Sequence, residues 1–268
     1  MDAKTFALFR DLVYERSGIS LGEGKETLVS ARLGKRMRAL GIKSHREYLE
    51  YALAHEADGE VVYLLNAIST NFTSFFRESA HFDMLRALLS QWLATGQQRL
   101  RLWCAASSTG EEPYTLAMLV REAIGSRPVD ARILATDIST RVLEVAVRGE
   151  YDAERLQPVP LSLRTRYFDD FEAEGETRYR ARETLKQLLV FRRLNLSTPP
   201  FPMSGPFDAV FCRNVMIYFD QAVRARLVGE IVRLLKPGGY LFVGHSESLT
   251  GVSAGLCAVQ PSVYAKPE

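Results

Sequence analysis

Apolar residues recur at a helical spacing from the N-terminus to about residue 95. Glycine, serine and aspartate stand at the ends of these stretches, as they do at the ends of helices. The pattern predicts successive helices at Phe6–Arg16 before Gly18, Thr27–Leu40 before Gly41, Ser44–His55 and Asp58–Ile68. We therefore expect an all-α N-terminal domain over residues 1–70, followed by a linker and helix over residues 71–95.

From Arg99 onward, short apolar runs alternate with helical stretches. The pattern predicts strands at Arg99–Cys104, Ala131–Thr136, Leu188–Leu194, Phe207–Cys212 and Tyr240–Gly244, and helices at Pro113–Ile124, Ser139–Arg148 and Gln221–Leu235. This alternation is typical of a mostly parallel sheet with helices on both faces, so residues 96–268 are expected to form a Rossmann-like α/β domain. Residues Leu256–Lys266 predict two further strands around Pro261, as an antiparallel edge.

The segment Asp169–Lys186 interrupts this alternation. An acidic turn, Glu172–Thr177, precedes a polar strand, Arg178–Arg182, in which basic residues alternate with others. The segment predicts a small antiparallel β-subdomain inserted at about residues 168–187. It is either a solvent-exposed connection between two core elements or a docking surface.

The composition is that of an ordinary globular protein. The 268 residues are 47% hydrophobic and 25% charged, with a net charge of +2. This balance excludes a strong global attraction to nucleic acid, and no apolar run reaches the ~20 residues needed to cross a bilayer. We expect neither nucleic-acid binding nor membrane insertion. The N-terminal stretch shows no apolar core or cleavage site of a secretion signal, so we expect a cytoplasmic location.

The cysteines and histidines give no sign of a disulfide framework or a metal site. Each cysteine stands alone in an apolar run, and no two histidines have the spacing of metal ligands. The residues concerned are Cys104, Cys212, Cys257, His45, His55, His81 and His245. We therefore expect reduced thiols and no bound metal.

The turn after the first predicted strand carries the first chemical signal. Residues 105–110 are all small or hydroxylated, and Pro113 suits the first turn of a helix. Two carboxylates, Glu111 and Glu112, stand where a phosphate-binding turn would offer bare amides. A ligand with its own positive charge and no phosphate, such as S-adenosylmethionine, fits this turn better than a dinucleotide. Either glutamate taken alone is explained equally well as a complement to the helix dipole.

Polar residues also follow the next predicted strands. Asp137 ends the second strand, where its carboxylate could accept both hydroxyls of a ribose, or could cap the helix that starts near Ser139. Asn195 follows the third strand and could offer a donor and an acceptor to an adenine edge. Arg213 and Asn214 follow the fourth. Because the carboxyl ends of parallel strands meet at one edge, these side chains are expected to converge.

The chain resembles a known family, the chemotaxis receptor glutamate methyltransferases (CheR), over nearly its whole length. The motifs that carry the resemblance are Asn71–Arg77, Ala105–Tyr114, Ala135–Ile138, Phe207–Phe219, Leu235–Gly239 and Gly244–Glu247. The family transfers a methyl group from S-adenosylmethionine to glutamate side chains of chemoreceptors. The resemblance implies an all-α N-terminal domain, a methyltransferase domain and a β-subdomain inserted in the latter.

The resemblance also implies which residues contact the cofactor. They are Asn71, Thr73, Arg77, Glu111, Asp137, Asn195, Leu196, Arg213 and Asn214. Which of Glu111 and Glu112 makes the contact stays open. Without the resemblance, Asn71, Thr73 and Arg77 would be interpreted as structural residues of a linker. With it, the linker is expected to fold over the cofactor, so that the N-terminal domain closes the site.

The chemistry of methyl transfer to a glutamate needs no general base, because the carboxylate is already ionised at cytosolic pH. The enzyme must instead position the carboxylate in line with the methyl group and exclude water. Tyr218, which follows the strand bearing Arg213 and Asn214, has a hydroxyl that could orient the acceptor. The alternative is that Tyr218 is a half-buried aromatic residue of the next helix.

A basic segment gives a candidate for substrate recognition. Residues 25–46 contain seven basic side chains and one acid, a local charge of +6 in a nearly neutral chain. Arg32, Lys35 and Arg36 share one helical face, with Arg38 beside them, and this face suits a receptor surface that carries unmodified glutamates. Without the resemblance, a solvated helix face would be the better interpretation.

The resemblance implies a partner and a place of action. The partner is the cytoplasmic domain of transmembrane chemoreceptors, with a receptor C-terminal peptide as a further candidate ligand of the β-subdomain. We expect a monomeric cytoplasmic protein that is recruited to receptor arrays at the inner membrane. Two other functions stay open: methylation of a nucleic acid or small molecule, and a non-catalytic signalling module that binds S-adenosylmethionine.

Overall fold

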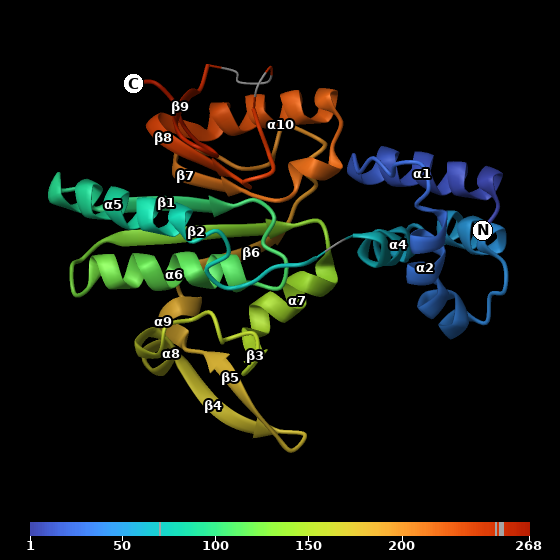
Figure 1. Cartoon of the computed structure of the whole chain (residues 1–268), viewed down its shortest axis with the longest axis horizontal. Helices are drawn as coiled ribbons and strands as arrows, with labels where there is room; N and C mark the ends of the chain where they lie inside the picture. The colour runs from blue at the N-terminus through green and yellow to red at the C-terminus, as the bar shows by residue number, and fades with distance from the viewer. Residues whose placement is uncertain (70, 250, 252–254) are drawn as a thin grey trace.

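The N-terminal helices form a small bundle of their own in the computed structural model, which describes residues 1–69, 71–249, 251 and 255–268 (Figure 1). Its helices are α1 (Ala3–Ser17), α2 (Glu26–Leu40), α3 (His45–Ala54) and α4 (Glu60–Ile68). Phe9, Leu33, Tyr48 and Leu64 are fully buried in the core of the bundle. The predicted helices are confirmed, except that α4 starts two residues later than expected.

Local chemistry explains where these helices begin and end. The side chain of Asp2 accepts a hydrogen bond from the amide of Thr5 and caps α1, and Ser44 caps α3 in the same way. Gly18 ends α1 with a φ of 71°, a left-handed conformation that glycine adopts without steric cost. α4 starts late because Gly59, at a φ of 86°, occupies the capping position in place of Asp58.

The rest of the chain is built on a 7-stranded sheet with the order β6-β2-β1-β7-β8-β10-β9. The strands are β1 (Arg99–Cys104), β2 (Asp130–Asp137), β6 (Leu189–Arg193), β7 (Phe207–Cys212), β8 (Leu235–Val243), β9 (Cys257–Gln260) and β10 (Val263–Ala265). β6, β2, β1, β7 and β8 are parallel, whereas β10 and β9 form the predicted antiparallel edge. The Rossmann-like fold is confirmed. β8 begins before the expected Tyr240, because Leu235 already pairs with Phe207 across a register shift.

Helices cover both faces of the sheet, as the alternation predicted. They are α5 (Ala80–Ala94), α6 (Glu111–Ile124), α7 (Thr140–Arg148) and α10 (Gln221–Leu234). One apolar core joins α5 and α6 to Leu102 of β1, and a second joins α10 to the neighbouring Trp103. Adjacent residues of a strand point to opposite faces, so these two cores are the two faces of the sheet.

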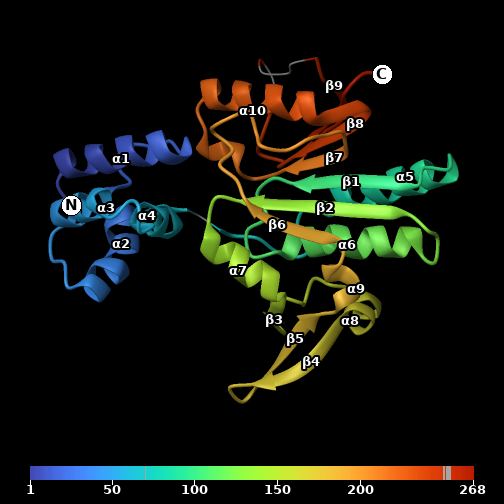
Figure 2. The ribbon, with the colours of Figure 1, turned by 180° about the vertical axis from the view of Figure 1, so that it is seen from behind.

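The inserted segment is larger than the hairpin that the sequence predicts. It contains a 3-stranded sheet with the order β3-β5-β4, made of β3 (Glu150–Asp152), β4 (Phe168–Ala173) and β5 (Glu176–Ala181), with short helices α8 (Leu161–Tyr167) and α9 (Glu183–Lys186). It projects away from the main sheet (Figure 2). β3 pairs with β5 and was not predicted, because three residues are too few to show a periodicity.

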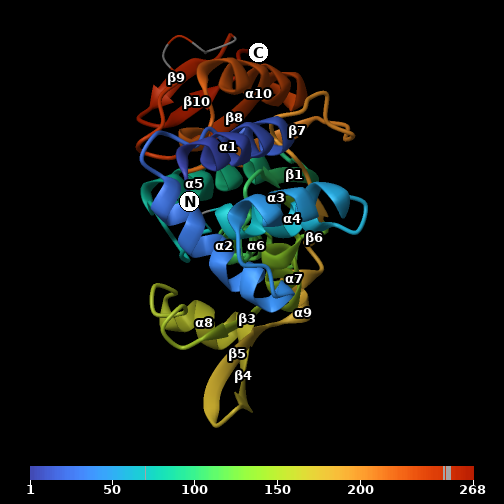
Figure 3. The ribbon, with the colours of Figure 1, turned by 90° about the vertical axis from the view of Figure 1, so that its right-hand side faces the viewer.

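The order of the strands positions a ligand site. From β1 the chain runs outward through β2 to β6 on one side, and through β7 to β8 on the other. In open α/β sheets a ligand crevice lies at such a reversal, beyond the carboxyl ends of the strands. The N-terminal helices stand in front of that edge (Figure 3). Within the described ranges, no helix has the length and apolar character to cross a membrane.

Candidate active site

A cavity of about 220 Å³ lies between the N-terminal helices and the carboxyl edge of the sheet. Its wall combines residues of α2, the linker after α4, and the loops that follow β1, β2, β6 and β7. Most of the residues predicted from the sequence line it: Arg32, Asn71, Thr73, Arg77, Asp137, Asn195, Leu196, Arg213, Asn214 and Tyr218. Glu111, Lys35, Arg36 and Arg38 lie outside the set of lining residues.

Asp137 is held at the end of β2 by backbone amides. Its Oδ2 accepts a hydrogen bond of 2.9 Å from the amide of Ser108, and its Oδ1 accepts one of 2.9 Å from the amide of Ser139. Burial raises the pKa of this carboxyl above its ordinary value, and the two amides partly offset that rise. The helix cap of α7 is Ser139 and not Asp137, so the structural alternative for Asp137 is wrong.

Glu111 and Glu112 point to different surroundings. Glu111 is buried against the inserted segment, where it accepts hydrogen bonds from Thr109 at 2.7 Å and from Arg155 at 2.8 Å. Glu112 lines the cavity and accepts hydrogen bonds from Arg213 at 2.6 Å and from the thiol of Cys104 at 3.1 Å. The placement favours Glu112 for the cofactor contact. Arg155 was not predicted from the sequence as a partner of Glu111, because no local sequence pattern relates it to the turn after β1.

Arg213 is the centre of a buried ionic network. Its side chain is 1% exposed, and besides Glu112 it contacts the Glu78 carboxylate at 3.0 Å and the carbonyl of Arg77. Burial lowers the pKa of the guanidinium, but Glu112 and Glu78 outweigh this and hold it above its ordinary value. The Nε atom is buried without a partner among the described residues. The network therefore fixes one permanent positive charge at the cavity wall.

Glu78 was not singled out in the sequence, although it follows Arg77 in the linker. It accepts hydrogen bonds from Arg213 and from the side-chain amide of Asn214, the latter at 3.1 Å. Burial raises the pKa of Glu78, but these two partners lower it below its ordinary value, so Glu78 is ionised at neutral pH. Glu78 thus joins the linker to the loop after β7.

Glu247 fixes the same loop from the other side. Its carboxylate accepts backbone hydrogen bonds from Gly244 at 2.6 Å, Asn214 at 2.8 Å and Ile217 at 3.2 Å. These bonds support Asn214 in a left-handed conformation, with a φ of 57°. The Gly244–Glu247 motif was the only signal for this residue, and it named no role.

The side-chain amide of Asn195 makes most of its hydrogen bonds to other residues of the chain. Its Nδ2 donates to the carbonyl of Arg16 at 2.9 Å, and its Oδ1 accepts both the amide and the hydroxyl of Ser197, at 3.0 and 2.9 Å. Both lone pairs of the oxygen are occupied, so one N–H remains for a ligand. The expectation that this side chain also offers an acceptor to adenine is therefore wrong. It ties α1 to the loop after β6.

Tyr218 belongs to a short 3₁₀ helix, Met216–Tyr218, and lines the cavity with a half-buried side chain. Its backbone carbonyl accepts a hydrogen bond of 2.8 Å from the amide of Ser20, and Phe219 next to it bridges to Ile19. The segment after α1 is thereby fixed against the loop that bears Tyr218. Tyr218 is therefore both a residue of the cavity wall and a half-buried aromatic residue, and its role in orienting the acceptor stays a prediction.

The linker lies over the turn after β1. The carbonyl of Asn71 accepts a hydrogen bond of 2.8 Å from the Ser108 hydroxyl, and the amide of Phe76 donates to the Thr115 hydroxyl at 3.3 Å. Arg77 donates to the carbonyl of Phe72 at 3.0 Å, and its guanidinium lies 5.3 Å from the centre of the Phe72 ring. These contacts place the linker along one wall of the cavity.

Some basic side chains of α2 are bound to other residues of the protein, and others are exposed. Arg36 donates to the buried carboxylate of Glu60 at 2.9 Å and stacks on Tyr63 at 4.2 Å, so its charge is used inside the bundle. Arg32 contacts the carbonyl of Ile68 and lines the cavity. Lys35 and Arg38 are exposed. Arg36 is thus paired with a residue of α4, which the sequence did not predict, and its role in binding a substrate stays a prediction.

A sheet whose parallel strands reverse their order beside a cavity lined by carboxylates fits the class of S-adenosylmethionine-dependent methyltransferases. A family model described as the CheR methyltransferase all-alpha domain matches residues 4–69, and one described as the CheR methyltransferase SAM binding domain matches residues 71–263. The chain belongs to the CheR methyltransferase family.

Curated relatives of the family cover nearly the whole chain. Chemotaxis protein methyltransferase 2 of Pseudomonas aeruginosa is 41% identical over 259 residues, which are 97% of this chain and 91% of that protein. The chemotaxis protein methyltransferase of Escherichia coli is 38% identical over 260 residues, which are 97% of this chain and 90% of that protein.

The donor set of the cavity fits S-adenosylmethionine. Asp137 offers carboxylate oxygens, which suit ribose hydroxyls, and Glu112 places a second carboxylate near the start of α6. Arg77 and Arg213 supply positive charge for a ligand carboxylate. The cofactor combines all three features, since it carries a ribose, an ammonium group and a carboxylate.

Proposed function

We propose that this protein transfers a methyl group from S-adenosylmethionine to glutamate side chains on the cytoplasmic domain of chemoreceptors. The observation that carries the proposal is the position of the cavity, between the sheet edge and the N-terminal helices, where a protein acceptor would contact both. Family membership supports the acceptor class, since the curated relatives are chemotaxis methyltransferases.

The cofactor contacts follow from the residues that line the cavity. Asp137 holds the ribose, and the Asn195–Leu196 backbone together with the remaining N–H of Asn195 faces the base. Glu112 and Arg213 hold the amino-acid end, with Asn214 beside them. Asn71, Thr73 and Arg77 close the site from the linker. Glu111 supports the turn through Thr109 and Arg155 rather than touching the cofactor.

Methyl transfer here depends on position and on exclusion of water. S-adenosylmethionine, when bound, supplies an electrophilic methyl group on a sulfonium centre. The acceptor glutamate is ionised and needs no base, so the chain has only to orient it and to keep water out. Tyr218, at the cavity wall, donates its hydroxyl to the acceptor carboxylate and sets its direction of approach.

Receptor recognition falls to the exposed part of the basic helix. Lys35 and Arg38 are exposed on α2, and Arg32 on the same helix reaches the cavity wall. A surface of this charge suits receptor helices that carry unmodified glutamates. The β-subdomain, which projects from the main sheet, is a further docking element for a receptor tail peptide (Figure 2). The protein acts as a monomer in the cytoplasm, recruited to receptor arrays.

The proposal is tested with methyl-labelled S-adenosylmethionine and a receptor cytoplasmic fragment. Mild base should release the label as methanol, because a carboxyl methyl ester hydrolyses under those conditions and an N-methyl or C-methyl group does not. Asp137→Asn, which alters a cavity carboxylate, should reduce labelling. Base-stable label, or label on nucleic acid with a steep salt dependence, would overturn the glutamate assignment. Binding without any transfer would indicate a non-catalytic module.

A further inference from the structure

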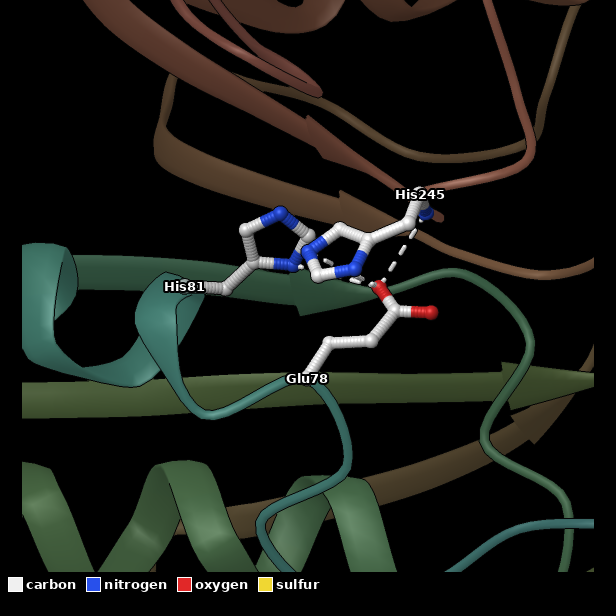
Figure 4. Close-up of side chains that lie close together, drawn as sticks. All are labelled: Glu78, His81 and His245. Atoms are coloured by element: carbon white, nitrogen blue, oxygen red, sulfur yellow. Dashed lines mark hydrogen bonds and ion pairs between the residues drawn. The ribbon is translucent and has the colours of Figure 1, made fainter.

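A glutamate and a histidine of neighbouring turns meet a second histidine from a distant part of the chain (Figure 4). Glu78 ends the linker, His81 lies in the first turn of α5, and His245 follows β8. Glu78 Oε2 lies 3.6 Å from Nδ1 of His81 and 3.9 Å from Nε2 of His245. One potential ligand atom from each residue lies within 4.8 Å of the others.

The side chain of His81 gives a second, independent observation at this cluster. Its side chain is 1% exposed, and both of its ring nitrogens are buried without a hydrogen-bond partner among the described residues. Buried polar atoms are nearly always paired, so an unpaired imidazole beside a carboxylate indicates an absent partner. A cation would bind one ring nitrogen of His81, leaving the other as an N–H, and would at the same time engage Glu78 and His245.

We propose that Glu78, His81 and His245 form a site for a transition-metal cation, Zn²⁺ in particular, that is coupled to the cofactor site. Two imidazoles and one carboxylate are a common zinc donor set, which leaves a fourth position for water. Ligand atoms around tetrahedral Zn²⁺ lie about 3.4 Å apart at its usual bond lengths. The two distances from Glu78 to the histidines, 3.6 and 3.9 Å, are close to this value, and the two imidazoles, whose ligand atoms lie within 4.8 Å of each other, would have to move closer together on binding the ion.

The charges around the cluster admit a cation despite the nearby guanidinium. Arg213 has one positive charge, and it stands between the carboxylates of Glu78 and Glu112. The set of three therefore has a net negative charge before a metal binds. Asn214 donates to the other oxygen of Glu78 at 3.1 Å and would orient it as an outer partner of the metal. His245, whose side chain is 56% exposed, gives the ion a path from solvent.

The same geometry couples the metal to the cofactor. Glu78 Oε2 is 3.0 Å from Nη2 of Arg213, and a metal on that oxygen competes with the guanidinium for it. Arg213 lines the cavity, so its displacement changes the wall that holds the cofactor. Zinc binding should therefore weaken cofactor binding, and the cofactor should weaken zinc binding by the same factor.

Zinc binding is tested directly on the full chain by calorimetric titration of ZnCl₂. The parent protein for this test carries Cys257→Ser, which removes the exposed thiol, and every variant is made in this parent. None of the proteins has an affinity tag. We expect one Zn²⁺ per chain, and a loss of at least about tenfold in affinity for His245→Ala. The matched control is His55→Ala, at the C-terminal cap of α3, which should bind zinc as the parent does. Equal zinc affinity in His245→Ala, or no saturable binding by the parent, would overturn the site.

The coupling is measured with S-adenosylhomocysteine, the demethylated product. Zinc should lower its affinity about tenfold in the parent chain, and EDTA should restore it. His245→Ala should bind S-adenosylhomocysteine normally in EDTA, which shows that it is folded, and should be insensitive to zinc. Unchanged product affinity in zinc-loaded parent would overturn the coupling. Because neither readout needs methyl transfer, failure here is distinguishable from failure of the proposed acceptor.

Discussion

Oε2 of Glu78 lies 3.0 Å from Nη2 of Arg213, and this contact joins the linker to the loop after β7 across the wall of the cavity. The Arg213 side chain is 1% exposed and that of Glu78 is 14% exposed, so solvent screens the pair weakly. The linker and the loop after β7 are thereby connected beside the cavity. The position of Arg213 depends on a residue that makes no direct contribution to the cavity wall.

Glu78→Gln should weaken cofactor binding because it removes the charge that positions Arg213 and Asn214. A hydrogen bond to a charged group is worth ~1.5–3 kcal/mol, which corresponds to a loss of roughly tenfold to a hundredfold in affinity. Calorimetry with S-adenosylhomocysteine measures it. Glu56→Gln, which disrupts an exposed pair with Arg16, is the control and should leave the affinity unchanged.

Substitutions of the two adjacent glutamates should have different effects on cofactor affinity in the same calorimetric assay. Glu112→Gln should reduce cofactor affinity by roughly tenfold or more, because Glu112 lines the cavity and pairs with Arg213. Glu111→Gln should leave affinity nearly unchanged and lower thermal stability, because its partners are Thr109 and Arg155. The reverse order of affinities would show that Glu111 makes the contact.

Tyr218→Phe should lower kcat while leaving cofactor affinity intact. The loss of a hydrogen bond to the acceptor carboxylate corresponds to roughly tenfold to a hundredfold in rate. Tyr63→Phe, at a largely exposed position on α4, is the matched control. Turnover equal to that of the parent would remove Tyr218 from the mechanism and leave it a structural residue.

Charge reversal on α2 should separate receptor recognition from folding. Lys35→Glu with Arg38→Glu should raise the apparent KM for the receptor several-fold and make it less sensitive to salt, because both side chains are exposed. Cofactor affinity should not change. An unaltered KM would move the recognition surface elsewhere. Arg36 is unsuitable for this test, since Arg36→Glu would place a second acid beside the buried Glu60.

Acid should destabilise the N-terminal bundle through Glu60. The hydrogen bonds from Arg36 lower the pKa of Glu60 below the 4.5 of an unperturbed glutamate. The folded state therefore binds fewer protons than the unfolded state, so the stability from this group is complete above pH 4.5 and is lost as the pH falls through the lower folded value. Urea unfolding between pH 7 and 3 should show this loss in the parent, and a smaller one in Glu60→Gln.

The sheet could be predicted closely because its strands are long and buried. Arg99–Cys104 and Phe207–Cys212 have the bounds expected from their apolar runs. The alternation with helices also predicted that these strands run parallel, as β1, β2 and β7 do. β3 could not be predicted, because its three residues acquire their pairing from β5 on the far side of α8.

Local patterns alone predicted site residues where a residue ends or follows a strand, whereas Asn71, Thr73 and Arg77 were predicted from the family resemblance. Asp137 ends a strand and Arg213 follows one, and both reach the cavity. Arg36 was assigned to the surface because helical spacing carries no information about Glu60 on another helix. Glu78, Arg155 and the His81–His245 pair act through contacts between distant parts of the chain, which local spacing cannot reveal.

The most direct test of the account is to locate the methyl group on the acceptor. The purified chain is incubated with S-adenosylmethionine and a chemoreceptor cytoplasmic fragment, and the acceptor peptides are sequenced by tandem mass spectrometry. We expect the added methyl mass on glutamate side chains, its loss on treatment with mild base, and little of it with Asp137→Asn. Methyl groups on any other side chain, or none in the presence of bound cofactor, would contradict it.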